Sequence, residues 1–163
     1  MKPKKNKGKQ FESKIREAFE KVPNVSIDRV HDQTTKYKGS TNICDFIVYK
    51  EPYEYYIECK SVRGNILPFS NIRENQWNGL LEKSKIEGVY AGVICWWVDK
   101  DYTAWLPINM LEDLRNLGDK SISYKGDWQN FYDTWKWFWL SGKKKRVFFD
   151  YDMEEFFKNA CRK

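Results

Sequence analysis

The sequence predicts an α/β domain in which a β-sheet is flanked by helices. Three observations support this class: apolar residues near the start recur at helical spacing, several hydrophobic runs have the length and composition of strands, and helical patterns lie between those runs. A chain of 163 residues, 41% of them hydrophobic, is long enough for one domain with a substantial core.

The N-terminal part is predicted to hold a basic arm, a helix and a strand. Residues 1–9 form the arm, which carries Lys2, Lys4, Lys5, Lys7 and Lys9. A helix is predicted from Gly8, because one helical face is apolar at Phe11, Ile15, Ala18, Phe19 and Val22. Alternation over residues 25–30 predicts a half-buried strand, and a polar loop follows it.

The central part is predicted to add four strands and two helices. Residues 43–49 and 53–62 are two β-rich runs joined by a short turn, which predicts an antiparallel hairpin. Asn71 and Glu74 have the spacing of a capping box and predict that a helix opens there. Residues 89–98 and 102–107 are predicted strands, and a short helix with Met110, Leu111 and Leu114 follows them.

Beyond Gly118 the composition becomes aromatic and basic. Both faces of residues 135–140 are apolar, so burial in the core or in a dimer interface is favoured over a stack for unpaired bases. Residues 143–146 read KKKR, for which a solvated loop is favoured over a DNA contact. A terminal helix is predicted at residues 153–160. We expect residues 10–118 to form the core domain and residues 119–163 an extension packed on it.

The net charge of +6 favours anionic partners, with nucleic acid first among them. No apolar run approaches the ~20 residues that span a bilayer, and the lysine-rich start lacks the apolar stretch of a signal peptide. We therefore expect no membrane partner and a cytoplasmic location. Four widely spaced cysteines and one histidine argue against a zinc module.

The predicted hairpin brings acidic side chains together. A turn centred between Glu51 and Pro52 places Asp45 opposite Glu58, and directly opposed residues have Cβ atoms about 4.5–5.5 Å apart on one face. Two carboxylates that close repel each other unless a proton or a cation lies between them. Mg²⁺ is a hard ion that accepts one or two carboxylates. Lys60 lies on the same face and could hold a water molecule or offset negative charge.

The other face of this hairpin is predicted to be apolar, with Cys44 opposite Cys59 beside Phe46 and Ile57. A simpler interpretation of the charged face is a solvated ion pair between a glutamate and a lysine, worth ~0–1 kcal/mol. The position of Asp45 on the same face favours the metal site.

Four motifs carry a resemblance to a known family: NKGKQFE at 6–12, CDFIVYK at 44–50, YIECKS at 56–61 and LPFSNIRENQ at 67–76. They resemble the PD-(D/E)xK nuclease superfamily and, within it, the RecU family of Holliday junction resolvases. The resemblance runs, with gaps, over roughly residues 6–115. It implies a restriction-endonuclease-like fold, in which a mixed β-sheet is flanked by helices.

The resemblance also implies roles for individual residues. Asp45 and Glu58 would bind Mg²⁺, for which Mn²⁺ may substitute, and Lys60 would assist the attacking water. Gln76 would approach the scissile phosphate or the nucleophile, and Glu12 would support the metal through water; the simpler alternatives are a helix-surface amide and a solvent-facing acid. The positions expected to contact DNA are Lys7 and Gly8 from the family's N-terminal motif, Lys36 and Lys38 in the polar loop, and Arg63, Asn71 and Arg73 around the centre.

One departure concerns the long stalk that RecU proteins carry between their first two strands. Here Val30 and Ile43 are joined by twelve residues only, which fits a compact, phage-type member. We expect a Mg²⁺-dependent, structure-selective endonuclease that resolves four-way DNA junctions by paired symmetric nicks as a homodimer. The alternatives are a nuclease of the same superfamily that acts on linear or flapped DNA, and a DNA-binding module without catalysis.

Overall fold

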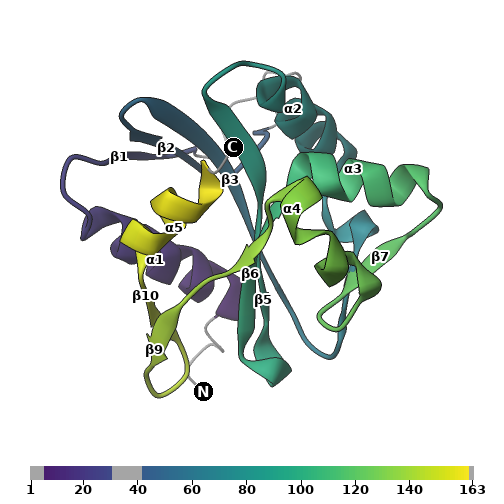
Figure 1. The fold of residues 1–163 in the computed structure, drawn as a ribbon. Helices are drawn as coiled ribbons and strands as arrows, with labels where there is room; N and C mark the ends of the chain where they lie inside the picture. Colours follow the sequence, from purple (N-terminus) through teal and green to yellow (C-terminus); the bar gives the residue numbers. More distant parts are fainter. Residues whose placement is uncertain (1–5, 31–41, 162–163) are drawn as a thin grey trace, which may run out of the picture.

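A six-stranded mixed sheet organises the chain in the computed structural model, which describes residues 6–30 and 42–161 (Figure 1). The strand order is β1-β2-β3-β5-β6-β8. These strands are β1 (Ser26–Arg29), β2 (Phe46–Lys50), β3 (Tyr53–Val62), β5 (Val89–Trp97), β6 (Tyr102–Pro107) and β8 (Phe138–Trp139). β3 and β5 pair in parallel, because the chain crosses one face of the sheet between them, and the other pairs among the described strands are antiparallel.

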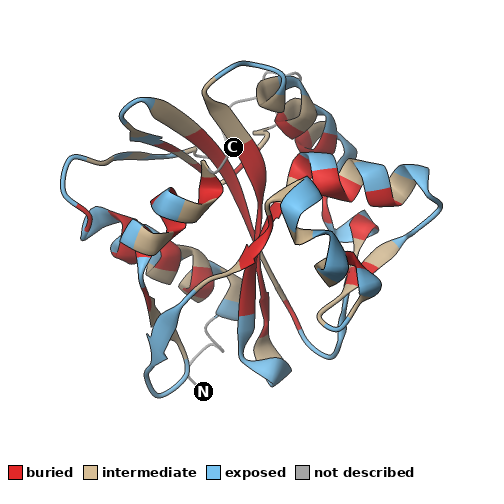
Figure 2. Cartoon of the chain, viewed as in Figure 1, coloured by how far each residue is buried: buried red, intermediate tan, exposed pale blue. Residues whose placement is uncertain are grey.

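The helices cover both faces of this sheet. Figure 1 shows α1 (Lys7–Glu20) and α5 (Met153–Ala160) on one side, and α2 (Glu74–Ser84) and α3 (Ile108–Asn116) on the other. The burial colours of Figure 2 show that the central strands are almost wholly enclosed between these layers. The predicted α/β class and the predicted helices around Phe11, Met110 and Phe156 are therefore confirmed.

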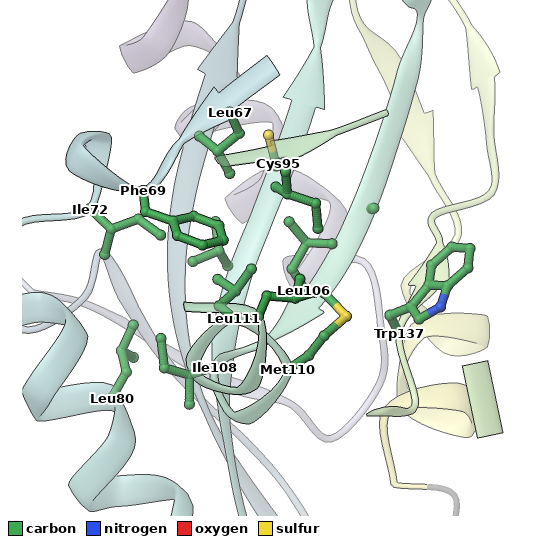
Figure 3. Close-up of a cluster of buried hydrophobic side chains, with 14 of the residues drawn as sticks. Leu67, Phe69, Ile72, Leu80, Cys95, Leu106, Ile108, Met110, Leu111 and Trp137 are labelled. Atoms are coloured by element: carbon green, nitrogen blue, oxygen red, sulfur yellow. The ribbon is translucent and has the colours of Figure 1, made fainter. Parts of the chain in front are cut away.

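Two apolar clusters fill the layers. One lies between the sheet and α1 with α5, and includes Phe11, Phe19, Ile57, Cys59, Trp105 and Phe156. The other lies between the sheet and α2 with α3, and Figure 3 shows its centre, formed by Leu67, Phe69, Ile72, Leu80, Cys95, Leu106, Ile108, Met110, Leu111 and Trp137. Alternation along β3 directs Tyr56, Glu58 and Val62 towards this second cluster.

The predicted hairpin register is confirmed between Phe46 and Lys50 on β2. The regular ladder ends where Phe46 lies opposite Ile57, and the Asp45 N–H also donates to the carbonyl of Ile57 at 3.0 Å. This shift of one residue turns the preceding Cys44 into the α2–α3 cluster, whereas Cys59 stays in the α1–α5 cluster. The expectation that the two cysteines share one apolar face is therefore wrong.

The start of α2 also differs from the prediction. Residues Phe69–Asn71 form a 3₁₀ turn, η1, and α2 begins only at Glu74. Phe69 and Ile72 are both buried, so packing of these side chains holds the chain in a tight turn before the helix. The cap is then a hydrogen bond from the Arg73 N–H to Gln76 Oε1, at 3.2 Å. The predicted capping box of Asn71 and Glu74 is wrong.

The residues after Gly118 contribute to both layers. β7 (Ser121–Ser123) pairs with β4 (Ile66–Pro68), and β8 adds the sixth strand beside β6. Between them lie η3 (Asp127–Phe131) and α4 (Tyr132–Trp135). Trp137 is buried, with its ring centroid 4.5 Å from that of Trp128, so burial rather than base stacking describes this side chain.

The chain then forms a hairpin of β9 (Gly142–Lys144) and β10 (Phe149–Tyr151), which leads into α5. A further 3₁₀ turn, η2 (Val98–Lys100), joins β5 to β6. Among the helices of the described residues, none is long and apolar enough to cross a bilayer.

Candidate active site

Asp45 and Glu58 meet where β2 enters the sheet beside β3. The Cys59 N–H donates to Asp45 Oδ2 at 2.8 Å, which ties the Asp45 side chain to the residue next to Glu58. The carboxyl groups of Asp45 and Glu58 are close enough to share a hydrogen bond when one of them is protonated. The irregular end of the β2–β3 ladder therefore brings two acids together at one point of the sheet.

Glu58 is buried and only partly satisfied. Its side chain is 4% exposed, Lys60 Nζ lies 2.7 Å from its Oε1, and the Gln76 side chain lies beside it. Its Oε2 has no hydrogen-bond partner among the described residues. Burial, followed by the charge of Asp45, raises the pKa of Glu58 to about 7, although Lys60 and Gln76 act in the opposite direction.

Burial also raises the pKa of Asp45, against the lowering effect of the Cys59 N–H and the Lys60 ammonium. The pKa values of both acids thus lie above those of exposed carboxyl groups. A divalent cation would relieve this repulsion as a proton does, and the unpartnered Glu58 Oε2 provides a ligand for it.

The side chains present fit Mg²⁺. The donors are carboxylate oxygens, and Mg²⁺ usually keeps several waters beside one or two carboxylates. Within residues 6–30 and 42–161, no group of three His, Cys, Asp or Glu side chains gathers closely enough to hold a metal ion by itself. Two carboxylates with water and a substrate phosphate are therefore the ligand set that this centre can offer.

Glu12, on α1, lies beside this pair. It is half-buried, and Arg29 Nη2 on β1 lies 3.4 Å from its Oε2. Burial, followed by the charge of Asp45, raises the pKa of Glu12, while Arg29, Lys60 and Lys9 act to lower it. Glu12 thus belongs to the same electrostatic cluster, although it does not complete a three-acid metal group.

These residues line one cleft of about 510 Å³. Of the predicted site positions, the structure brings together Asp45, Glu58, Lys60, Gln76, Glu12, Asn71 and Arg73 on its walls. Within the part of the chain that the structure describes, the cationic side chains on the cleft wall are Lys9, Arg29, Lys60 and Arg73. A groove that combines an acidic centre with a cationic wall suits a phosphodiester that approaches a metal ion.

Lys7, Gly8 and Arg63, which are also predicted to contact DNA, do not line this cleft. Lys7 and Gly8 are in the first turn of α1, where a β-carbon at Gly8 would lie 3.8 Å from Ser61 Oγ at the end of β3. Arg63 is not on the cleft wall and lies 3.6 Å from Asp99 across a solvent-exposed ion pair. Lys36 and Lys38 lie outside the described residues.

Arg29 and Lys9 are cleft residues that sequence reasoning missed. The signal for Arg29 is strand pairing, because Arg29 lies opposite Phe46, the neighbour of Asp45. The sequence predicts the strand but not this register, since the polar loop after it leaves the pairing partner open. The lysine-rich composition of residues 1–9 hides Lys9 within the basic arm, although the helical spacing of Lys9 and Glu12 places them on one face of α1.

Helix α2 positions the two acids from one side. Gln76 contacts Glu58, while Gly79, one turn further on, packs against Ile43, two residues before Asp45. A β-carbon at position 79 would lie 2.7 Å from Ile43 Cβ and still closer to Cγ2. The Asn75 side chain also donates to the carbonyl of Asn42 at 3.3 Å. The segment that directly precedes Asp45 is therefore held against α2.

Gly79→Ala is expected to weaken Mg²⁺ binding about tenfold, because overpacking at Ile43 costs about 1–3 kcal/mol and displaces Asp45. Helix propensity alone favours alanine by up to about 1 kcal/mol, so a loss of Mg²⁺ affinity in this variant would come from the contact with Ile43. The measurement is titration calorimetry of Mg²⁺. Ile43→Gly in the same chain removes both the crowding Cβ and the methyl groups and is expected to restore most of the affinity. Unchanged affinity in Gly79→Ala would show that the contact does not position Asp45.

The strand order, the parallel β3–β5 pair and the helices on both faces define a mixed α/β fold with a central sheet, which is the fold class that the sequence predicts. Among solved structures, the chain is similar to Hjc, a Holliday junction resolvase from the archaeal hyperthermophile Archaeoglobus fulgidus, with a TM-score of 0.51 and 17% sequence identity. The match covers 76% of this chain and 93% of that chain.

No protein-family model and no curated protein sequence matches the chain. The structural likeness establishes the fold, while the closer assignment to the RecU family and to a phage-type member stays a prediction.

Proposed function

We propose that this chain is a Mg²⁺-dependent DNA endonuclease that resolves four-way junctions. The observation that carries the proposal is the pair of a partly buried Asp45 and a buried Glu58, with an unpartnered carboxylate oxygen on Glu58 and the Lys60 ammonium beside it. The cationic wall of the cleft supports a nucleic-acid substrate. The fold shared with the archaeal resolvase supports the choice of a junction.

Each side chain has a role that its position supports. Asp45 and Glu58 would hold Mg²⁺, which supplies stabilisation of negative charge on the phosphodiester. Lys60 would orient the attacking water or offset charge on the phosphate, since its Nζ lies beside Glu58 Oε1. Gln76, which both caps α2 and contacts Glu58, would hold the orientation of that carboxylate.

The remaining cleft residues would act at longer range. Glu12 would orient water near the metal, and Arg29 would offset its negative charge across their 3.4 Å ion pair. Lys9 and Arg73 would contact the backbone on either side of the scissile bond. These contacts set the position of the strand rather than its sequence preference.

The proposed active form is a homodimer. Resolution of a four-way junction requires nicks in two strands of like polarity, and a two-fold axis supplies two equivalent centres. Asp45 and Glu58 of one chain would account for one nick, and the same pair in the second chain would account for the other.

A second candidate function is cleavage of linear or flapped DNA by the same centre. The short connection between Val30 and Ile43 favours it, because no long stalk is available to enter the middle of a junction. If junction cleavage holds, the same shortness supports a compact, phage-type member of the RecU family.

The experiment compares a mobile four-way junction with a linear duplex of the same sequence in the presence of Mg²⁺. We expect paired, symmetric nicks in two junction strands and slow cleavage of the duplex. Equal cleavage of both substrates would favour the second candidate. Absence of cleavage, together with absence of Mg²⁺ or Mn²⁺ binding in calorimetry, would leave a DNA-binding module without catalysis.

A further inference from the structure

The β9–β10 hairpin carries a concentration of positive charge that the candidate active site does not use. Its strands and tip include Lys143, Lys144, Lys145 and Arg146, and residues 141–147 are all exposed. These four cations and the five lysines of the N-terminal arm exceed the net charge of +6, so the rest of the chain is net negative. Positive charge is therefore gathered in two segments.

The β9–β10 hairpin lies beside α1, as Figure 1 shows. Lys7 and Lys9 of the arm lie in the first turn of the same helix. The hairpin packs against α1, and together they form a groove of about 320 Å³. Lys14 and Lys21 line the groove from the helix, and Lys145 and Arg146 line it from the hairpin.

The acids near this groove are already paired. Glu17 accepts from Lys14 at 2.8 Å, and Asp150 accepts from Lys21 at 2.6 Å. Lys144 pairs with Asp101 on the turn before β6. In contrast, Lys143, Lys145 and Arg146 have no acid within ion-pair distance among the residues that the structure describes. Three cations at the hairpin thus remain available for an external anion.

We propose that the β9–β10 hairpin is a second DNA-binding element, which holds the phosphate backbone of the duplex next to the cleavage site. This inference rests on the proposed nuclease function and extends the substrate-binding surface beyond the cleft. Lys9 and Glu12 on one side of α1 line the cleft, while Lys14 and Lys21 on another side line the groove.

The dimensions of a duplex suit this arrangement. A helix with its side chains is about 10–12 Å wide, and the major groove of B-DNA is about 12 Å wide. The two backbones that border one groove can therefore lie on either side of α1, one towards the cleft and the other towards the hairpin. The hairpin would add affinity without sequence preference, because its contacts are to phosphates.

The test replaces Lys143, Lys145 and Arg146 together by glutamine. The three side chains are exposed, so the fold is expected to be retained, which circular dichroism and thermal unfolding check. Binding of a four-way junction and of a duplex is measured with Ca²⁺ in place of Mg²⁺, over a series of salt concentrations. The affinity is expected to fall at least about tenfold at low salt, and the slope of log affinity against log salt to decrease by about two to three, near 0.9 for each lost phosphate contact.

A matched control removes three exposed lysines that line neither the cleft nor the groove: Lys85, Lys125 and Lys158. This control is expected to change the slope by less than one. The cleavage rate at saturating DNA is expected to be unchanged in the hairpin variant, because the chemistry lies in the cleft.

An unchanged affinity and slope in the hairpin variant, with a wild-type protein that binds and cuts DNA, would overturn the hairpin proposal alone. A wild-type protein that binds no DNA would overturn the proposed function as well. Dissociation of a wild-type dimer into monomers in the hairpin variant, measured by sedimentation, would assign the hairpin to a subunit contact and also reject the proposal.

Discussion

Glu58→Gln is expected to lower the rate of Mg²⁺-dependent DNA cleavage at least about 10³-fold, because a metal site contributes several kcal/mol of transition-state stabilisation and each 1.36 kcal/mol is tenfold in rate. Glutamine keeps the volume of the side chain but removes the charge that would hold the ion. Junction binding is expected to persist, since the cationic side chains of the cleft are unchanged. Single-turnover cleavage and binding of a labelled junction measure the two effects separately.

Glu54→Gln is the matched control, because Glu54 lies on the same strand, four residues away, and does not line the cleft. It is expected to cleave at the wild-type rate. Metal-dependent cleavage at the wild-type rate in Glu58→Gln would remove Glu58 from the active site.

Lys60→Met is expected to keep Mg²⁺ binding and to lose cleavage, since the ammonium beside Glu58 Oε1 is removed while both acids remain.

The β2–β3 hairpin shows which parts of this centre local sequence determines. A short turn and two alternating runs define the register, so the meeting of Asp45 and Glu58 follows from a few adjacent residues. The face on which Cys44 lies does not follow from these residues. The one-residue offset at Asp45 depends on Ile43, which packs against Gly79 of a helix 36 residues later in the chain.

The start of α2 and the position of β8 are two further features that local sequence patterns do not predict. The spacing of Asn71 and Glu74 predicts a capping box, but burial of Phe69 and Ile72 in the core decides where the helix begins. β8 has only two residues and reaches β6 after a long connection, so no local pattern indicates its pairing. In both cases tertiary packing outweighs a weak local preference.

The hairpin pattern predicts where Glu58 lies but not that it is buried, and its burial changes both its pKa and the stability of the fold. The simpler interpretation of the sequence is a solvated ion pair, in which Glu58 would be exposed to water. In the structure the Glu58 side chain is instead buried beneath α2, next to Gln76. A buried acid beside another acid lowers stability when both are ionised, and this effect can be measured without any nuclease assay.

In the metal-free protein, a rise from about pH 5 to about pH 8 is expected to lower the free energy of unfolding. Glu58 has a pKa of about 7 in the folded protein, against an ordinary value of 4.5, so the folded state binds the proton more tightly than the unfolded state. Stability is therefore highest below the unfolded pKa and falls as the pH rises through the folded pKa. The shift corresponds to about 3 kcal/mol, at 1.36 kcal/mol for each pKa unit.

Urea unfolding in EDTA, at a series of pH values, compares the wild type with Glu58→Gln. Because glutamine cannot ionise, the variant is expected to become the more stable protein towards pH 8, by up to about 3 kcal/mol, with little difference near pH 5. Mg²⁺ is expected to stabilise the wild type more at pH 8 than at pH 5, since protons compete for the same oxygens. If the difference between the two proteins is the same at every pH, Glu58 carries no buried charge and the case for a cation between the two acids fails.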